Sequence, residues 1–234
     1  MKTILITGAA GGLGSCLVLE YISRGYFVFG CDIQKGSRLD GISDQYPGQF
    51  SYVPMNAGDD ESVKTAANYV AVRTKKLDII INAVGILPPN SANKLEDFDI
   101  TASLEVLNIN SLGPLRVTKG FINLLKKGED KVLVNISSEA GSMTTHNNYV
   151  NRYDYCMSKA GVNMQSIILQ RYYKPDGIKV LAVHPGWMKT GMGGEKAIIE
   201  PEISAKGIAD LADKRKHQLE NGIYFDYDGS PRAW

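Results

Sequence analysis

The segment TILITGAAGGLGSCLVLEYISRG, residues 3–25, contains the transition that decides the fold. Residues 3–7 form a short β-branched apolar run, and residues 13–24 carry apolar side chains at helical spacing. The turn between them, residues 8–12, is rich in glycine. Glycine permits a tight turn and lets backbone amides approach a pyrophosphate, while the helix N-terminus supplies partial positive charge. The segment therefore predicts a strand, a phosphate-binding loop and a helix.

The rest of the chain continues the alternation of strands and helices. Further strands are predicted at residues 26–31, 50–55, 77–82, 131–137, 178–184 and 222–225. Further helices are predicted at residues 59–74, 101–127, 155–173 and 204–219. Mostly apolar strands separated by helices predict a parallel sheet covered on both faces. We expect a Rossmann-like doubly wound α/β fold, with residues 1–234 forming one dinucleotide-binding and catalytic domain.

Composition narrows the function classes. The chain of 234 residues has a formal net charge of +1, which argues against a nucleic-acid or anionic membrane partner. No run reaches the roughly 18 apolar residues of a membrane span. Cys16, Cys31 and Cys156 lack metal-ligand spacing, so we expect free thiols in a reducing compartment and no metal site. A soluble, cytoplasmic protein acting on small molecules is expected.

Tyr155 and Lys159 form the candidate catalytic pair. They stand four residues apart in a predicted helix, so their side chains share one face. An adjacent ammonium favours the phenolate form of a tyrosine, as a general acid/base near neutral pH requires. A YxxxK pair alone is more often a plain helix surface pair, so its meaning depends on accompanying motifs.

Those accompanying motifs resemble the short-chain dehydrogenase/reductase family. The glycine turn has the spacing TGxxxGxG, which begins at Thr7, and residues 134–138 (VNISS) resemble the family's serine motif. The resemblance implies hydride transfer between a nicotinamide and an alcohol or carbonyl group. It makes Tyr155 the general acid/base, Lys159 the group that orients the cofactor ribose and lowers the tyrosine pKa, and Ser138 the group that holds the substrate oxygen. Ser137 is the alternative serine.

The resemblance also extends to Asn110, which would hold a water that connects Lys159 to solvent. It implies cofactor contacts from Tyr155 and Lys159 and from the family's turn and loop positions, namely Gly8, Gly12, Leu13, Gly14, Asn56, Asn82, Ala83, Gly85, Pro185, Gly186 and Thr190. In the NAVG turn Val84 is inserted before the glycine, and Thr190 can alternatively cap a short helix.

Asp32 ends the second predicted strand, where this fold places its ribose-binding acid. A carboxylate there accepts hydrogen bonds from ribose hydroxyls and repels a 2′-phosphate. We therefore expect NAD(H) to be preferred. NADP(H) stays open, because Lys35 and Arg38 lie nearby in the sequence.

Two loops and the C-terminal tail bear on how a substrate would bind. Residues 143–152 are longer than the family's usual stretch and are expected to line the entrance, with His146 as an exposed loop residue rather than a substrate ligand. Residues 187–200 have the glycine content of a lid, and His184 before them is expected to be structural. The tail, residues 222–234, resembles a carbonyl-reductase-like branch that includes C-factor and sniffer proteins.

Two questions stay open at the level of sequence. A dinucleotide-binding regulatory or signalling module without turnover is the alternative function, although such a module has no need of Asn110, Ser138, Tyr155 and Lys159 together. The resemblance also implies a homodimer or homotetramer formed through the helices around Asn110 and Tyr155. Apolar residues of the second helix serve either that interface or the core, namely Met157, Met164, Ile167 and Ile168.

Overall fold

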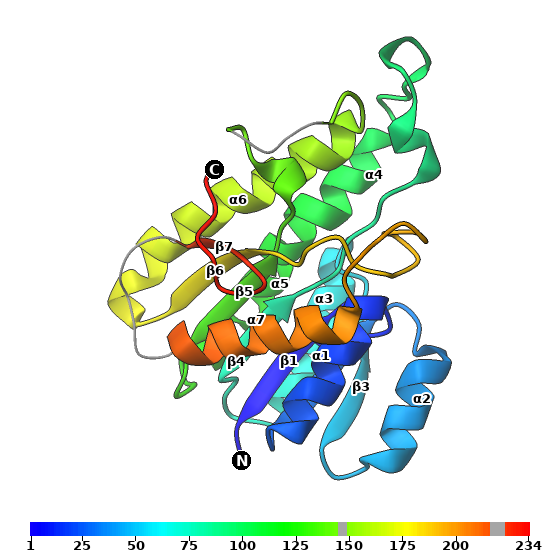
Figure 1. Ribbon diagram of the computed structural model, residues 1–234. Coiled ribbons are helices and arrows are strands. Elements are labelled where there is room, and N and C mark those ends of the chain that lie inside the picture. The colour runs from blue at the N-terminus through cyan, green and yellow to red at the C-terminus, as the bar shows by residue number, and fades with distance from the viewer. Residues whose placement is uncertain (145–148, 216–222) are drawn as a thin grey trace.

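The computed structural model describes residues 1–144, 149–215 and 223–234. In these residues the strands form one parallel sheet of seven, in the order β3-β2-β1-β4-β5-β6-β7 (Figure 1). The strands are β1 (Thr3–Thr7), β2 (Phe27–Asp32), β3 (Phe50–Pro54), β4 (Ile79–Asn82), β5 (Val132–Ile136), β6 (Lys179–His184) and β7 (Tyr224–Asp226). His146, residues 216–219 of a predicted helix and Gly222 of a predicted strand lie outside the described residues.

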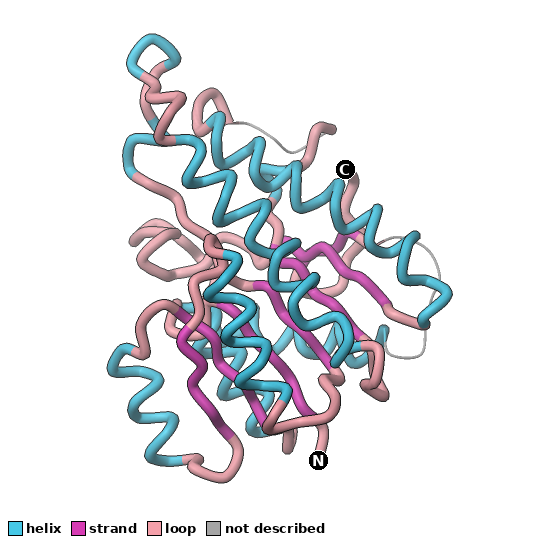
Figure 2. The backbone as a smooth tube through the Cα atoms, turned by 180° about the vertical axis from the view of Figure 1, so that it is seen from behind, coloured by secondary structure: helices cyan, strands magenta, loops and turns pink. Residues whose placement is uncertain are grey.

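Helices cover both faces of this sheet (Figure 2). They are α1 (Gly12–Ser23), α2 (Gly36–Gln45), α3 (Asp60–Ala71), α4 (Ser103–Leu107), α5 (Gly113–Leu125), α6 (Tyr153–Tyr173) and α7 (Pro201–Arg215). Apolar side chains of α1, α2 and α7 pack in one core cluster, and those of α3, α5 and α6 pack in the other. The structure confirms the predicted doubly wound α/β fold.

The alternation of side chains along the strands divides the core in two. In β1 every residue is buried, with Ile4 and Ile6 in the cluster under α1 and α7 and Leu5 in the cluster under α3 and α5. Successive strand residues point to opposite faces, so a strand buried on both sides must be apolar throughout. This explains why the predicted strands are continuous apolar runs rather than alternating ones.

The order of the strands determines where the site lies. The chain runs outward from β1 through β2 to β3, then returns to the other side of β1 with β4. In such sheets a crevice forms outside the carboxyl ends of the strands where the order reverses. The glycine turn after β1 and the turn after β4 meet at this edge, where Thr7 Oγ1 accepts a hydrogen bond from the Ala83 amide at 3.1 Å.

Two elements differ from the sequence-based expectation. Helix α2 was not predicted, because residues 36–45 contain only two residues that become buried, Leu39 and Ile42. The predicted helix at residues 101–127 is α4 and α5 joined by a π-helical turn, η3 (Asn108–Leu112). Pro114 has no N–H with which to bond the Asn110 carbonyl, so a regular α-helical ladder cannot pass this point.

The remaining element boundaries agree with prediction to within a few residues, as is usual for helix and strand ends. Helix α6 begins at Tyr153, two residues before its predicted start. In the described ranges no helix is both long enough and apolar enough to cross a membrane.

Candidate active site

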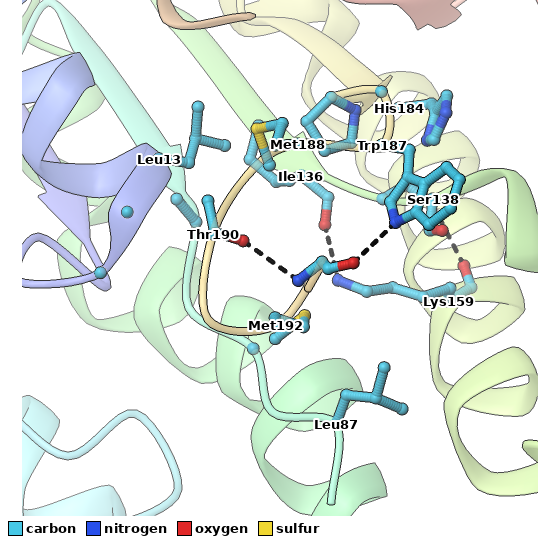
Figure 3. A pocket seen from close by; sticks show the side chains of 18 of the residues that line it. Leu13, Leu87, Ile136, Ser138, Lys159, His184, Trp187, Met188, Thr190 and Met192 are labelled. Atoms are coloured by element: carbon cyan, nitrogen blue, oxygen red, sulfur yellow. Dashed lines mark hydrogen bonds between the residues drawn. The ribbon is translucent and has the colours of Figure 1, made fainter. Parts of the chain in front are cut away.

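A cavity of about 630 Å³ opens at the carboxyl edge of the sheet. One wall is the glycine turn at the start of α1, and another is formed by α6 with the segment after β5. The loop after β6 closes a third side (Figure 3). Most of the predicted site residues line this cavity, namely Gly8, Gly12, Leu13, Gly14, Ala83, Gly85, Ser138, Tyr155, Lys159, Pro185, Gly186 and Thr190. Asp32, Asn56, Asn82 and Asn110 are not among the lining residues.

The glycine turn and the start of α1 have no room for side chains at Gly8 and Gly14. Gly8 has a φ of +67°, which favours glycine, and a Cβ on Gly14 would lie 1.9 Å from the Gly8 carbonyl oxygen. Helix α1 begins after Gly11 without a side-chain cap and without an acidic residue in its first turn. Its first amides are therefore available to an anion, and this backbone fits the pyrophosphate of a dinucleotide.

Asp32 ties the end of β2 to the glycine turn. Its Oδ2 accepts a hydrogen bond from the Ala10 amide at 2.9 Å, and its Oδ1 accepts one from the Ile33 amide at 2.7 Å. Both oxygens keep further lone pairs with which a ribose hydroxyl can bond. Lys35 is paired with Asp40 at 2.9 Å, and Arg38 is exposed.

Two predicted cofactor residues use their side chains elsewhere. The exposed Asn56 accepts a hydrogen bond from the Gly58 amide at 2.9 Å, which closes a local turn. Asn82 is buried, and its Nδ2 donates to Asn135 Oδ1 of the neighbouring strand at 2.9 Å. In the turn after β4 it is Ala83 and Gly85 that reach the cavity.

Tyr155 and Lys159 are both buried on α6, facing the cavity. Burial raises the pKa of Tyr155 to about 12, while a hydrogen bond with the Ser138 side chain acts in the opposite direction. Burial lowers the pKa of Lys159 to about 8, and its Nζ donates to the Ile136 carbonyl at 2.9 Å (Figure 3). The sequence-based expectation was a lowered tyrosine pKa. In the structure the loss of hydration has the larger effect on the Tyr155 pKa, because the Lys159 ammonium lies 5.7 Å from the ring centroid of Tyr155.

The two neighbouring serines have different partners. Ser137 is 1% exposed, and its hydroxyl donates to Asn163 Oδ1 at 2.6 Å. The Ser138 hydroxyl bonds with Tyr155 and also accepts from the Ala140 amide at 3.2 Å. Ser138 is therefore the serine placed beside the tyrosine, and it caps a short turn as well.

Asn110 holds the segment that follows β4. It lies in the π-helical turn η3 and is fully buried. Its Oδ1 accepts from the Ile86 amide at 2.8 Å, and its Nδ2 donates to the Ile86 carbonyl at 2.9 Å. A Cβ on Gly85 would lie 3.5 Å from Asn110 Oδ1 and 3.6 Å from Lys159 Nζ, so Asn110 and Lys159 both border the Gly85 turn.

The loop after β6 lies across the glycine turn. Trp187 Nε1 donates to the Gly193 carbonyl at 2.8 Å, and the Gly193 amide donates to Thr190 Oγ1 at 3.2 Å (Figure 3). A Cβ on Gly12 would lie 2.6 Å from Thr190 Cγ2. The Thr190 hydroxyl thus bonds within its own loop while its methyl group covers the start of α1.

Several lining residues were not identified from the sequence. They include Leu87 and Glu139, and each follows a motif by one or two residues, so proximity to the motifs was the available signal. Tyr149 and Arg152 lie in the loop that was expected to line the entrance, and Met188 and Met192 lie in the expected lid. His184 also lines the cavity, although its Nδ1 accepts a hydrogen bond from the Glu139 amide at 3.1 Å and burial lowers its pKa to about 4. These contacts give His184 a structural role.

Comparison with known proteins gives consistent matches along the chain. The family model described as short chain dehydrogenase matches residues 2–198. C-signal from Myxococcus xanthus is 32% identical over 163 residues, which cover 70% of this chain and 96% of that protein.

Solved structures with the same fold include two carbonyl reductases. Carbonyl reductase Sniffer of D. melanogaster has 25% identity and a TM-score of 0.91, with 100% of each chain covered. The NADPH-bound carbonyl reductase from chicken fatty liver has 27% identity and a TM-score of 0.88, covering 100% of this chain and 99% of that one. The resemblances predicted from the motifs and the tail are confirmed by these matches.

Proposed function

The chain belongs to the short-chain dehydrogenase/reductase family of NAD(P)-dependent oxidoreductases acting on CH–OH and C=O groups, and we propose that Tyr155 is its general acid/base toward a small carbonyl or alcohol substrate. One observation carries this proposal. Tyr155, Ser138 and Lys159 line the same cavity as the glycine turn, so a proton-transfer group and a dinucleotide-binding backbone share one space.

The residues divide the chemistry among them. A bound nicotinamide supplies or accepts the hydride. In reduction, Tyr155 gives its hydroxyl proton to the substrate oxygen while that oxygen gains negative charge. Ser138 bonds the same oxygen and holds it near the tyrosine. The Lys159 ammonium favours the phenolate that remains, and it also orients the ribose.

The raised pKa of Tyr155 determines the protonation state in which it meets a substrate. With a pKa raised to about 12, Tyr155 holds its proton at neutral pH. A phenol in this state is ready to act as an acid toward a carbonyl, whereas oxidation of an alcohol requires its ionised form.

NADH is the cofactor that we propose to be preferred. The Asp32 carboxylate lies at the end of β2, and Lys35, the nearer basic residue in sequence, is already paired with Asp40. A 2′-phosphate placed at this strand end would face the negative charge of Asp32. The chicken carbonyl reductase with NADPH bound shows that a protein of this fold can hold NADPH.

The substrate end of the cavity suits a compact compound with an apolar body. Leu87, Tyr149, Trp187 and Met192 contribute apolar surface there, beside the charged groups of Glu139 and Arg152. Trp187 is 49% exposed, so the entrance is open on that side. We propose an assorted range of small carbonyl compounds as substrates.

A signalling role is the second candidate function. The 32% identity to C-signal is the observation that favours it, because that protein's name describes a signal. A signalling module needs neither Tyr155 nor Ser138 in the cavity. Turnover therefore distinguishes the two functions.

We also propose that the chain pairs with a second copy through α5 and α6. We propose the cytoplasm as its location, where its three cysteines, none of them in a disulfide, would stay reduced. Met157, Met164 and Ile168 of α6 are more than half exposed, so core packing does not account for them. Leu112 and Leu115, at the start of α5, are exposed as well. An apolar face of this kind is unusual on a surface that meets only water.

The test of the proposed function begins with separate titrations of NADH and NADPH, followed by nicotinamide fluorescence, and then a panel of ketones, aldehydes and alcohols. We expect NADH to bind more tightly and at least one carbonyl compound to be reduced. Asp32→Asn retains an acceptor for the Ala10 amide but removes the negative charge. The dissociation constants for NADH and NADPH should therefore become more similar in this variant. Binding without turnover of any compound would favour the signalling module, and tighter NADPH binding would overturn the cofactor assignment.

A further inference from the structure

The backbone around Ser138 is held from outside its own strand. The Ser137 amide donates to the Val183 carbonyl of β6 at 2.8 Å, and the Glu139 amide donates to His184 Nδ1 at 3.1 Å. Between them, the Ser138 carbonyl accepts a hydrogen bond from the Tyr224 hydroxyl at 2.7 Å. The peptide groups on both sides of the Ser137–Ser138 pair, 136–137 and 138–139, are therefore fixed by β6 and β7.

Tyr224 is itself clamped. It is 2% exposed in β7, and the Trp234 ring stacks on it with centroids 5.0 Å apart and an interplanar angle of 18°. The chain turns back after β7, so that the Arg232 amide donates to the Tyr224 carbonyl at 2.9 Å. The Ala233 carbonyl then accepts from Ser142 Oγ at 3.0 Å. The tail segment, residues 230–234, thus contacts both Tyr224 and the serine segment, residues 137–142.

A second side chain links the same groups from α6. Asn163 Nδ2 donates to the Gly141 carbonyl at 3.1 Å, and its Oδ1 accepts from the Ser137 hydroxyl. Asn163 also bonds the Tyr224 hydroxyl, which lowers the otherwise raised pKa of that tyrosine. The serine segment is consequently attached to β7 and α6 by buried hydrogen bonds, while the Ser138 hydroxyl faces Tyr155.

We propose that Tyr224, clamped by Trp234, is a positioning residue that holds the Ser138 hydroxyl at its working place beside Tyr155. The inference rests on the proposed function of Ser138. A hydroxyl that bonds a developing oxyanion acts through its placement, and small displacements of such a group lower the rate steeply. Tyr224 itself lies behind the segment, so it acts through Ser138 and does not touch the substrate. The C-terminal tail, which resembles that of the carbonyl-reductase branch, thereby helps to position Ser138 through Tyr224.

The test uses Tyr224→Phe in the full chain, which removes the hydroxyl and keeps the ring that stacks on Trp234. We expect kcat to fall about 10-fold or more, with KM and the NADH dissociation constant nearly unchanged. Hydrogen exchange of the amides in residues 137–142 should become faster. The conservative Trp234→Phe should retain most activity, because it keeps a stacked ring, whereas Trp234→Ala should behave like Tyr224→Phe.

Tyr26→Phe is the matched control. Tyr26 is also buried, and its hydroxyl bonds Asp130 Oδ2 at 3.1 Å, but it precedes β2 at the opposite edge of the sheet. It should lose comparable stability without any change in kcat or in exchange at residues 137–142. Unchanged exchange in Tyr224→Phe would overturn the proposal, and so would faster exchange with an unchanged kcat. A wild-type chain that turns over no substrate would contradict the proposed function, while the exchange measurement would still decide whether Tyr224 holds the segment.

Discussion

Lys159 is a lysine buried in α6 beside the cavity. Its Nζ donates to the Ile136 carbonyl inside the protein, and burial lowers its pKa to about 8. Between pH 8 and 10.5 the unfolded chain binds more protons at this position than the folded chain. The resulting loss of stability is thus fully present below pH 8 and disappears as the pH rises toward 10.5. A pKa lowered from 10.5 to about 8 corresponds to about 3 kcal/mol.

Lys159→Met should therefore stabilise the protein while it removes activity. We expect the free energy of unfolding at pH 7 to rise by about 1 to 3 kcal/mol, because a buried charge is replaced by a side chain of similar length. Denaturant titrations of both proteins at pH 7 and pH 10 measure this. The difference should shrink at pH 10. A destabilised variant at pH 7 would show that the ammonium contributes more through its hydrogen bond than it costs through burial.

The pH dependence of turnover follows from the same pair. Carbonyl reduction should be nearly constant from pH 6 to about pH 7.5 and fall above about pH 8, since Lys159 loses its proton there while Tyr155 keeps its own. Alcohol oxidation should rise with pH, because the phenolate of Tyr155 becomes more populated. Profiles of kcat/KM in both directions test this, and a reduction rate that climbs through pH 8 would contradict it.

The sequence identified these residues but not their ionisation. Spacing on a helix predicted that Tyr155 and Lys159 share a face, and both line the cavity. The predicted lowering of the Tyr155 pKa was wrong, because the loss of hydration depends on what packs around the hydroxyl. Ser138 and Tyr149 are among the groups near it, and they come from the segment between β5 and α6, whose fold the sequence pattern does not specify. Asp32 and Asn56 were placed at the correct strand ends, yet their bonds to nearby amides could not be predicted from residue type.

Among the elements, the glycine turn leaves no space for an added methyl group at Gly14. A Cβ on Gly14 would lie 1.9 Å from the Gly8 carbonyl oxygen and 2.9 Å from Ala9 Cα, and both neighbours are backbone atoms. We expect Gly14→Ala to displace the first turn of α1 and to weaken NADH binding by at least about 100-fold, since the amides no longer converge on the pyrophosphate. Fluorescence titration with NADH measures the loss.

Gly41→Ala is the control for that change. Gly41 lies in α2 with open space around its Cα, so an added methyl group meets nothing within 4 Å. This variant should bind NADH normally. Alanine is favoured over glycine in a helix by up to about 1 kcal/mol, so the variant should also unfold at a slightly higher denaturant concentration. Normal NADH binding by Gly14→Ala would contradict the role given to the turn.

Elements with strong apolar patterns could be predicted, and those shaped by tertiary contacts could not. Strands β1 and β5 are fully buried and were predicted because every residue in them is apolar or tolerates burial. Helix α2 offers few apolar residues, so its pattern is weak. The π-helical turn at Asn110 needs both Pro114 in the chain and the bonds from Asn110 to Ile86, and the second of these is visible only in three dimensions.

At the scale of the whole molecule, α6 carries exposed apolar side chains among the described residues. Met164 and Ile168 stand four residues apart and are 53% and 57% exposed. If this face pairs with a second copy, Met164→Glu combined with Ile168→Glu should give a monomer, because two charges would be buried without partners. Light scattering on both proteins, with Leu19→Glu on α1 as the control at another exposed apolar position, measures this. A monomeric wild type would remove the interface.

The overall architecture was the most predictable level, since parallel strands, crossover helices and a glycine turn after β1 leave few alternative topologies. Exposure of a helix face was not predictable, because Met157 and Met164 suit a core as well as a surface. Only the packing of α6 against the rest of the chain separates the two cases.

In the proposed function Tyr155 moves the proton in a redox reaction at this cavity, and Tyr155→Phe is the most direct test of that role. The change removes the hydroxyl and keeps the ring, so the dissociation constant for NADH should stay close to that of the wild type. With a carbonyl compound that the wild type reduces, kcat should fall by at least about 100-fold, the lower end of what a positioned acid contributes. Turnover that survives in Tyr155→Phe, with NADH binding unchanged, would contradict the role of Tyr155 as the general acid/base.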